Sequence, residues 1–180
     1  DLLAALDIAI DRDIASANAA LAAGRPACLL LDTLLPGLDR LLSLRPRLGV
    51  RNSGHTMAKL IDPARGASLR VVAVTHPEYI ERMDEFLCAD AACAMLMRGT
   101  EGEAYANPRR RPAMKFYADG ALTFTVEAQG GGAPPNADVP DQPGVADNAA
   151  LIRAMLEGSV PVPGPIAEQV EALARHARRL

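Results

Sequence analysis

Hydrophobic residues in the middle of the chain form two short continuous runs with an amphipathic segment between them. The valine-rich run 69–74 and the apolar run 93–97 each have the length of a buried strand. Between them, residues 78–89 carry apolar side chains at helical spacing, and Pro77 suits the start of a helix. A strand, a helix and a second strand in this order predict a βαβ unit and therefore two parallel strands.

Two further apolar runs flank a turn sequence. Residues 114–117 and 122–126 lie on either side of Asp119-Gly120, a pair that is typical of tight hairpin turns. The pattern therefore predicts a β-hairpin near 113–127. Together with the βαβ unit it predicts an α/β fold, in which a mostly parallel central sheet is flanked by helices and the hairpin is an excursion from that sheet.

The remaining segments are predicted to be mainly helical, because their apolar residues recur at helical spacing. The predicted helices cover 14–23, 36–44, 54–61, 148–157 and 165–180. In the last of these helices, the residues predicted to face inward are Ile166, Val170, Leu173 and Ala174. The apolar run 27–31 predicts a short buried strand instead, and the stretch 128–147, rich in Gly and Pro, predicts an exposed loop.

The composition is that of a folded domain inside the cell. The chain has 180 residues, of which 49% are hydrophobic and 23% charged. Its apolar runs are far shorter than the roughly 20 residues that span a membrane, and no charged-then-apolar leader is recognised. The three cysteines are widely spaced without a CxxC pair, which favours free thiols in a reducing compartment. We therefore expect a cytoplasmic protein without a membrane partner.

Charge is distributed unevenly along the chain. The net charge is −3, yet residues 40–70 contain seven basic residues and one acid, whereas 119–157 contain six acids and one basic residue. This asymmetry favours an anionic ligand near the first segment, although solvated charged faces explain it equally well. Aromatic residues make up only 3% and Trp is absent, so a row of base-stacking side chains is not expected.

One candidate anion site lies at the start of the predicted helix 54–61. It consists of Arg51, Asn52, His55 and Lys59. The N-terminus of a helix attracts anions, and an arginine adds a bidentate fork for a carboxylate or phosphate. The alternative is structural, because serine or threonine here can cap the helix and a lone histidine is often structural as well.

Two further candidate sites follow the second predicted strand. Arg98 ends that strand, and Glu101 and Glu103 in the next loop are carboxylates of the kind that hold Mg²⁺; the alternative is a solvated turn. The second candidate is a compact basic cluster that is able to follow a phosphate backbone, or else forms ion pairs. It contains Arg109, Arg110, Arg111 and Lys115. No catalytic residue is predicted.

Several motifs in order resemble those of one known family. They are Leu-Gly-Val-Arg-Asn-Ser-Gly-His-Thr at 48–56, Val-Thr-His-Pro-Glu-Tyr at 74–79, Arg-Gly-Thr-Glu-Gly-Glu at 98–103, Asn-Pro-Arg-Arg-Arg-Pro at 107–112 and Leu-Glu-Gly at 156–158. This series resembles the anthranilate phosphoribosyltransferase-like branch of glycosyltransferase family 3. The resemblance implies that 1–180 is the larger part of an α/β domain, preceded in the family by a helical domain and a diphosphate loop, and that the full-length protein is a homodimer.

The resemblance also implies an activity. Enzymes of this family join the ribose of phosphoribosyl pyrophosphate to the amine of anthranilate with the help of Mg²⁺, and Arg51 falls where the family places an arginine that contacts the aromatic acid. The sequence departs from that pattern, because it lacks the glycine-rich diphosphate loop and has Ala104 and Tyr105 where the enzymes have an adjacent Asp-Glu metal pair. Members of this divergent branch are described as nucleic-acid-binding proteins that lack the anthranilate reaction.

Two functions are therefore expected from the sequence. The first is binding of nucleic acid through phosphate contacts without sequence specificity. Its expected contacts are Arg45, Arg47, Arg98, Arg109, Arg110, Arg111 and Lys115. The alternative is a Mg²⁺-dependent phosphoribosyl- or glycosyltransferase acting on an aromatic amine or acid such as anthranilate, with Glu101 or Glu103 assisting the metal.

Overall fold

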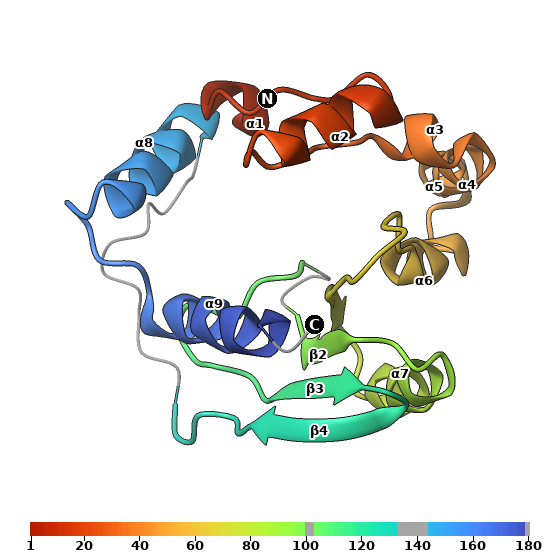
Figure 1. Ribbon diagram of the computed structural model, residues 1–180, viewed down its shortest axis with the longest axis vertical. Coiled ribbons are helices and arrows are strands. Elements are labelled where there is room, and N and C mark those ends of the chain that lie inside the picture. The colour runs from red at the N-terminus through yellow and green to blue at the C-terminus, as the bar shows by residue number, and fades with distance from the viewer. Residues whose placement is uncertain (100–102, 133–143, 179–180) are drawn as a thin grey trace. The chain divides into compact units, whose positions relative to one another are not determined.

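The chain folds into two compact units. The computed structural model describes residues 1–99, 103–132 and 144–178. Unit 1 comprises Asp1–Ala58 and Val139–Pro161, and unit 2 comprises Lys59–Asp138 and Val162–Leu180. The four-stranded sheet (Figure 1) lies wholly within unit 2. The expectation that 1–180 is the larger part of an α/β domain stays a prediction.

The sheet of unit 2 has the strand order β1-β2-β3-β4. Its elements in chain order are β1 (Arg70–Val74), helix α7 (Glu78–Ala89), β2 (Ala94–Arg98), β3 (Met114–Ala118) and β4 (Ala121–Val126). The strands β1 and β2 are parallel and are joined through α7, which confirms the predicted βαβ unit. At the hairpin turn, φ is 51° at Asp119 and 78° at Gly120, the left-handed values that a type I′ turn needs. The predicted hairpin is therefore confirmed as well.

The prediction of an α/β fold with flanking helices is confirmed, but the expected mostly parallel sheet is wrong. Only the β1–β2 pair is parallel, and the pairs β2–β3 and β3–β4 are antiparallel. The described part of the connection from β2 to β3 contains no helix. A parallel return to the sheet needs a crossover, which is usually helical, and without one β3 enters beside β2 in the opposite direction.

The two faces of the sheet carry separate hydrophobic clusters, as the alternation of side chains along a strand requires. On one face, Val72, Leu96 and Tyr117 pack with Met83 and Leu87 of α7. The other face is covered by helix α9 (Gly164–Ala177). Its cluster consists of Ala73, Met95, Met97, Met114, Phe116 and Ala172, with Leu173 packed against it.

The orientation of α9 differs from the prediction. Leu173 packs against the core as expected, but Val170 is 59% exposed and Ala174 is exposed as well. The residues that α9 buries are Ala172 and two polar ones, Gln169 and His176. The helix therefore packs against the sheet with a different face from the one that its aliphatic residues predicted.

Unit 1 is helical. Its helices are α1 (Leu2–Ala5), α2 (Ile14–Ala22), α3 (Leu31–Leu34), α4 (Pro36–Leu42), α5 (Arg45–Leu48), α6 (Gly54–Met57) and α8 (Val145–Leu156). The helices predicted at 14–23, 36–44 and 148–157 are confirmed. The one predicted at 54–61 begins as α6 and continues as a 3₁₀ turn (Ala58–Leu60).

The buried strand predicted at 27–31 is wrong. This segment forms only an isolated bridge between Asp11 and Leu29, and its residues are half-buried or exposed. Of the predicted loop 128–147, residues 128–132 are exposed, 133–143 lie outside the described residues and α8 begins at Val145. Among the helices that the structure describes, none has the length and apolar character needed to cross a membrane.

Candidate functional site

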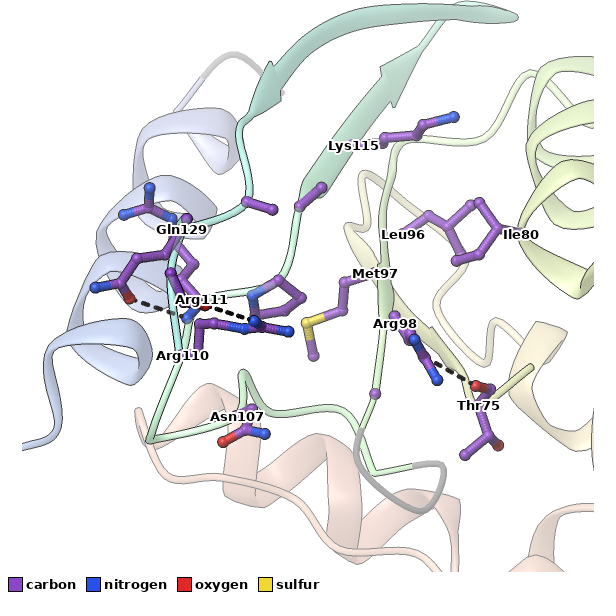
Figure 2. Close-up of a pocket in the computed structure, with 16 residues that line it drawn as sticks. Thr75, Ile80, Leu96, Met97, Arg98, Asn107, Arg110, Arg111, Lys115 and Gln129 are labelled. Atoms are coloured by element: carbon purple, nitrogen blue, oxygen red, sulfur yellow. Dashed lines mark hydrogen bonds between the residues drawn. The ribbon is translucent and has the colours of Figure 1, made fainter. Parts of the chain in front are cut away.

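A cleft of about 740 Å³ opens in unit 2 at the edge of the sheet where β1 and β2 end (Figure 2). Thr75 follows β1 and Arg98 ends β2, so the carboxyl ends of the parallel pair form one side. Because β3 and β4 are antiparallel, the start of β3 and the end of β4 reach the same edge, where Met114 pairs with both Met97 and Val126. Residues at the ends of these strands therefore line one cleft.

The lining of the cleft combines cationic and aliphatic side chains. Its charged members are Arg98, Arg110, Arg111 and Lys115. Ile80, Leu96 and Met97 contribute apolar surface. None of the described side chains that line it is acidic or aromatic. Such a lining suits an anion and offers no ring on which a base could stack.

Two of these arginines are held by backbone oxygens. The Nε of Arg98 donates to the carbonyl oxygen of Thr75 at 3.2 Å, and the Nη1 of Arg110 donates to that of Gly131 at 2.8 Å. Neither guanidinium pairs with a carboxylate of the described residues. A guanidinium has five N–H donors, so each of these keeps donors and its full charge for a ligand.

The other two cations have carboxylate partners. Arg111 pairs with Glu168 of α9, and its Nε donates to the carbonyl oxygen of Glu127 at 3.1 Å. The Nζ of Lys115 lies 3.6 Å from Oδ1 of Asp84 on α7. The buried Tyr117 donates its hydroxyl to the same carboxylate. Burial, followed by that hydrogen bond, raises the pKa of Tyr117, so Tyr117 remains a neutral donor.

The loop between β2 and β3 carries Arg110 and Arg111 and is tightly fitted. At its start a Cβ on Gly99 would lie 2.5 Å from the carbonyl oxygen of Glu103 and 2.7 Å from the Cβ of Ala73, so only glycine fits. Further along, the backbone of this loop is bound by the side chain of Gln169 from α9. Sequence reasoning missed Gln169, although its i+3 and i+7 spacing to Ala172 and His176 was a signal of a shared buried face.

The predicted anion site at 51–59 is divided between the two units. In unit 1, Arg51 is exposed, while Asn52 and His55 lie together. The Nδ2 of Asn52 donates to the carbonyl oxygen of Leu41, and its Oδ1 accepts from the N–H of Gly54, both at 2.9 Å. These bonds connect α4 with the start of α6. The structure therefore gives Asn52 a structural role.

Lys59 belongs to unit 2 and contacts the outer strand of the sheet. Its Nζ donates to the carbonyl oxygen of Ala73 in β1 at 2.7 Å. The strand β1 lies at the edge of the sheet, where backbone groups lack a neighbouring strand. Lys59 therefore supplies a hydrogen-bond donor to one carbonyl oxygen of that edge strand.

The remaining predicted site residues are placed as follows. Arg45 and Arg47 are exposed on α5 in unit 1, and Arg109 is exposed beside the cleft residue Arg110 in unit 2. Glu103 is exposed, and Glu101 lies outside the described residues. Within the part of the chain that the structure describes, no group of three His, Cys, Asp or Glu side chains is arranged to hold a metal ion.

The chain is similar in sequence to a bacterial protein. No protein-family profile matches the chain. The chain is 39% identical over 151 residues to a protein of Escherichia coli (strain K12) described as uncharacterized protein YbiB, an alignment that covers 82% of this chain and 46% of that protein. The chain thus spans about half the length of the curated relative that it matches.

Proposed function

We propose that this protein binds nucleic acid through phosphate contacts at the cleft of unit 2, without reading base sequence. One observation carries the proposal: Arg98 and Arg110 line the same cleft, are anchored to backbone oxygens and have no carboxylate partner among the described residues. Guanidinium groups held in this way match the geometry of phosphate oxygens.

The surroundings favour backbone contacts over base recognition. Phosphate contacts position a protein on nucleic acid but carry no sequence information. The described lining has no aromatic ring, so stacking on bases is not expected to contribute. The motif resemblance to a branch described as nucleic-acid-binding supports the same function. Since the net charge of the chain is −3, attraction must be local, and binding is expected to depend strongly on salt.

Fluorescence anisotropy of labelled DNA tests the proposal. Single- and double-stranded probes of unrelated sequence are titrated with the protein at about 50 and about 200 mM salt, and six to ten phosphate contacts should weaken binding by roughly 10³ to 10⁵ over that range. The variant R98Q/R110Q is expected to bind more weakly and to lower the slope of log K against log salt by about 2.

Arg175→Gln is the matched control for this experiment. Arg175 is exposed in the last turn of α9, belongs to the same unit and does not line the cleft. The single variants R98Q and R110Q each remove the same charge as R175Q and should each lower the slope, whereas R175Q should leave it unchanged. Absence of DNA binding by the wild-type protein at low salt, or equal losses in all three single variants, would overturn the proposal.

A second candidate function rests on the position of the cleft. It opens at the carboxyl ends of β1 and β2, which is where open α/β sheets place their ligands, and this favours the phosphoribosyltransferase alternative. If it applies, phosphoribosyl pyrophosphate with Mg²⁺ binds the wild-type protein in calorimetry, R98Q/R110Q loses that binding, and DNA does not compete for the cleft.

A cytoplasmic location is part of the proposal. The cysteines Cys28, Cys88 and Cys93 are all free thiols, as suits a reducing compartment. Burial raises the pKa of Cys93, which keeps this thiol protonated and poorly reactive at neutral pH.

A further inference from the structure

We infer that Gln169 of α9 is a positioning residue for the phosphate site: its buried amide holds the loop between β2 and β3 in the geometry that brings Arg110 to the cleft. The inference rests on the proposed function. It concerns a side chain that lies outside the lining of the cleft and acts only through the loop.

The amide of Gln169 binds two backbone groups of the loop at once. Its Nε2 donates to the carbonyl oxygen of Ala104 at 3.0 Å, and its Oε1 accepts from the N–H of Ala106 at 2.6 Å. One donor and one acceptor facing alternate residues reproduce what a neighbouring strand would offer. Gln169 is 4% exposed and Ala106 is fully buried, so water cannot easily replace the side chain.

A turn that contains two hydrogen bonds connects this contact with Arg110. Asn107 follows Ala106, and its Oδ1 accepts from the N–H of Arg109 at 2.9 Å. The carbonyl oxygen of Asn107 accepts from the N–H of Arg110 at 3.1 Å. The turn therefore begins at Asn107, directly after a residue that Gln169 holds, and ends at Arg110, which lines the cleft. Figure 2 labels both ends of this turn.

The helix that carries Gln169 is itself fixed on the sheet. Ala172 is part of the hydrophobic cluster, and the Nε2 of His176 lies 3.2 Å from the carbonyl oxygen of Tyr117. The imidazole ring packs edge-on against Phe116 at a centroid distance of 5.1 Å. Side chains on a rigid element hold a site more accurately than side chains on a loop. The amide of Gln169 thus fixes the loop relative to α9.

Arg98 provides an internal reference for the test. It lies on β2 and is held by Thr75, so its position does not depend on the contacts of Gln169. A defect caused by Gln169 should therefore be coupled to Arg110 and independent of Arg98. A general loss of structure would affect both arginines equally.

The experiment is a double-mutant cycle in the DNA anisotropy assay. Gln169→Leu is compared with Val170→Leu, which introduces the same side chain at the neighbouring exposed position of α9. We expect Q169L to lower the salt slope by about 1, as loss of one phosphate contact does, and V170L to leave it unchanged. Q169L/R110Q should bind no more weakly than R110Q, whereas the effects of Q169L and R98Q should add.

Hydrogen exchange of the Ala106 amide provides a readout that does not depend on DNA. It should be protected in the wild-type protein and V170L, and should exchange faster in Q169L. If circular dichroism shows that Q169L does not fold, Gln169→Asn replaces it, since the shorter amide cannot reach both backbone groups. Wild-type binding with equal slopes for wild type and the Gln169 variant overturns the inference alone. A wild-type protein that does not bind DNA overturns the proposed function and this inference together.

Discussion

The two units place their apolar side chains in opposite ways. In unit 2, Leu87, Phe116 and Tyr117 are completely buried on the two faces of a sheet. In the described part of unit 1 the buried residues are three alanines and a glycine, while large side chains such as Leu21 at 60% and Leu156 at 81% are exposed. The difference shows that an apolar pattern at helical spacing predicts a helix but not the core that stabilises it.

The arginines of the two units also differ in how their side chains are held. Arg98 and Arg110 in unit 2 are fastened to backbone oxygens and line a cleft. In unit 1, Arg45 and Arg47 are exposed on α5, a helix of four residues. A preorganised side chain loses less conformational entropy when it binds. The count of basic residues along the sequence favoured an anionic ligand near 40–70, whereas we propose the cleft of unit 2 as the phosphate site.

The largest expected effect concerns the two cores. Leu87→Ala removes a fully buried side chain from the cluster beneath α7 and should cost about 2–5 kcal/mol. Leu21→Ala changes an exposed position of α2 and should stay within about 0.5 kcal/mol. Native-state hydrogen exchange of the Val72 amide in β1 and the Ala20 amide in α2 measures the two units separately. Equal costs would contradict the contrast between the units.

A glycine substitution in each unit should change stability with opposite signs. Gly99→Ala places a methyl group against a backbone oxygen and Ala73, so the loop must shift, at a cost of about 1–3 kcal/mol. Gly37→Ala lies within α4 with no atom within 4 Å of the added Cβ, and the better helix former should stabilise by about 0.5–1 kcal/mol. Urea unfolding of both variants measures the signs. A stabilising G99A would show that the loop is not tightly fitted.

Local signals in the sequence were sufficient for the elements that local interactions determine. The hairpin at Asp119-Gly120 and the helix α7 lie where they were predicted, because a turn pair and an amphipathic stretch each specify their own structure. The run 27–31 has the composition of a buried strand but meets no partner beyond the single bridge at Leu29. Whether an apolar run becomes a strand depends on a neighbour that lies elsewhere in the chain.

The cleft was predictable only in part. Arg98, Arg110, Arg111 and Lys115 were chosen from the sequence as phosphate contacts, and the antiparallel return of β3 brings them to one cleft. Gln169 was not predicted, because the backbone groups that it binds are 63 and 65 residues away. A buried polar side chain has a role only through its partners, and these are visible only in the folded chain.

A binding comparison should separate the cations of the two units. R98Q/R110Q removes two anchored charges in unit 2, and R45Q/R47Q removes two exposed charges in unit 1. We expect the first to lower the salt slope of DNA binding by about 2 and the second by less than about 1. Anisotropy titrations of both variants at several salt concentrations measure these slopes. A greater loss in R45Q/R47Q would place the main phosphate contacts in unit 1.

The smallest expected effect is at the start of α2, where Asp13 and Ser16 form a capping box. The carboxylate of Asp13 accepts from the backbone N–H of Ser16 at 2.7 Å, and Ser16 Oγ accepts from the N–H of Asp13 at 3.2 Å. The backbone bond, followed by the Ser16 hydroxyl, lowers the pKa of Asp13 below its ordinary value. A lowered pKa means that the cap stabilises α2 above about pH 4 and is lost as the pH falls through the folded-state pKa. The Ser16 amide shift, followed by NMR during acid titration, should report this loss with an apparent pKa below the ordinary value of an aspartate. Asp13→Asn keeps an accepting oxygen but cannot titrate, so it should flatten the curve. The same titration in both proteins would show that another carboxylate controls the start of α2.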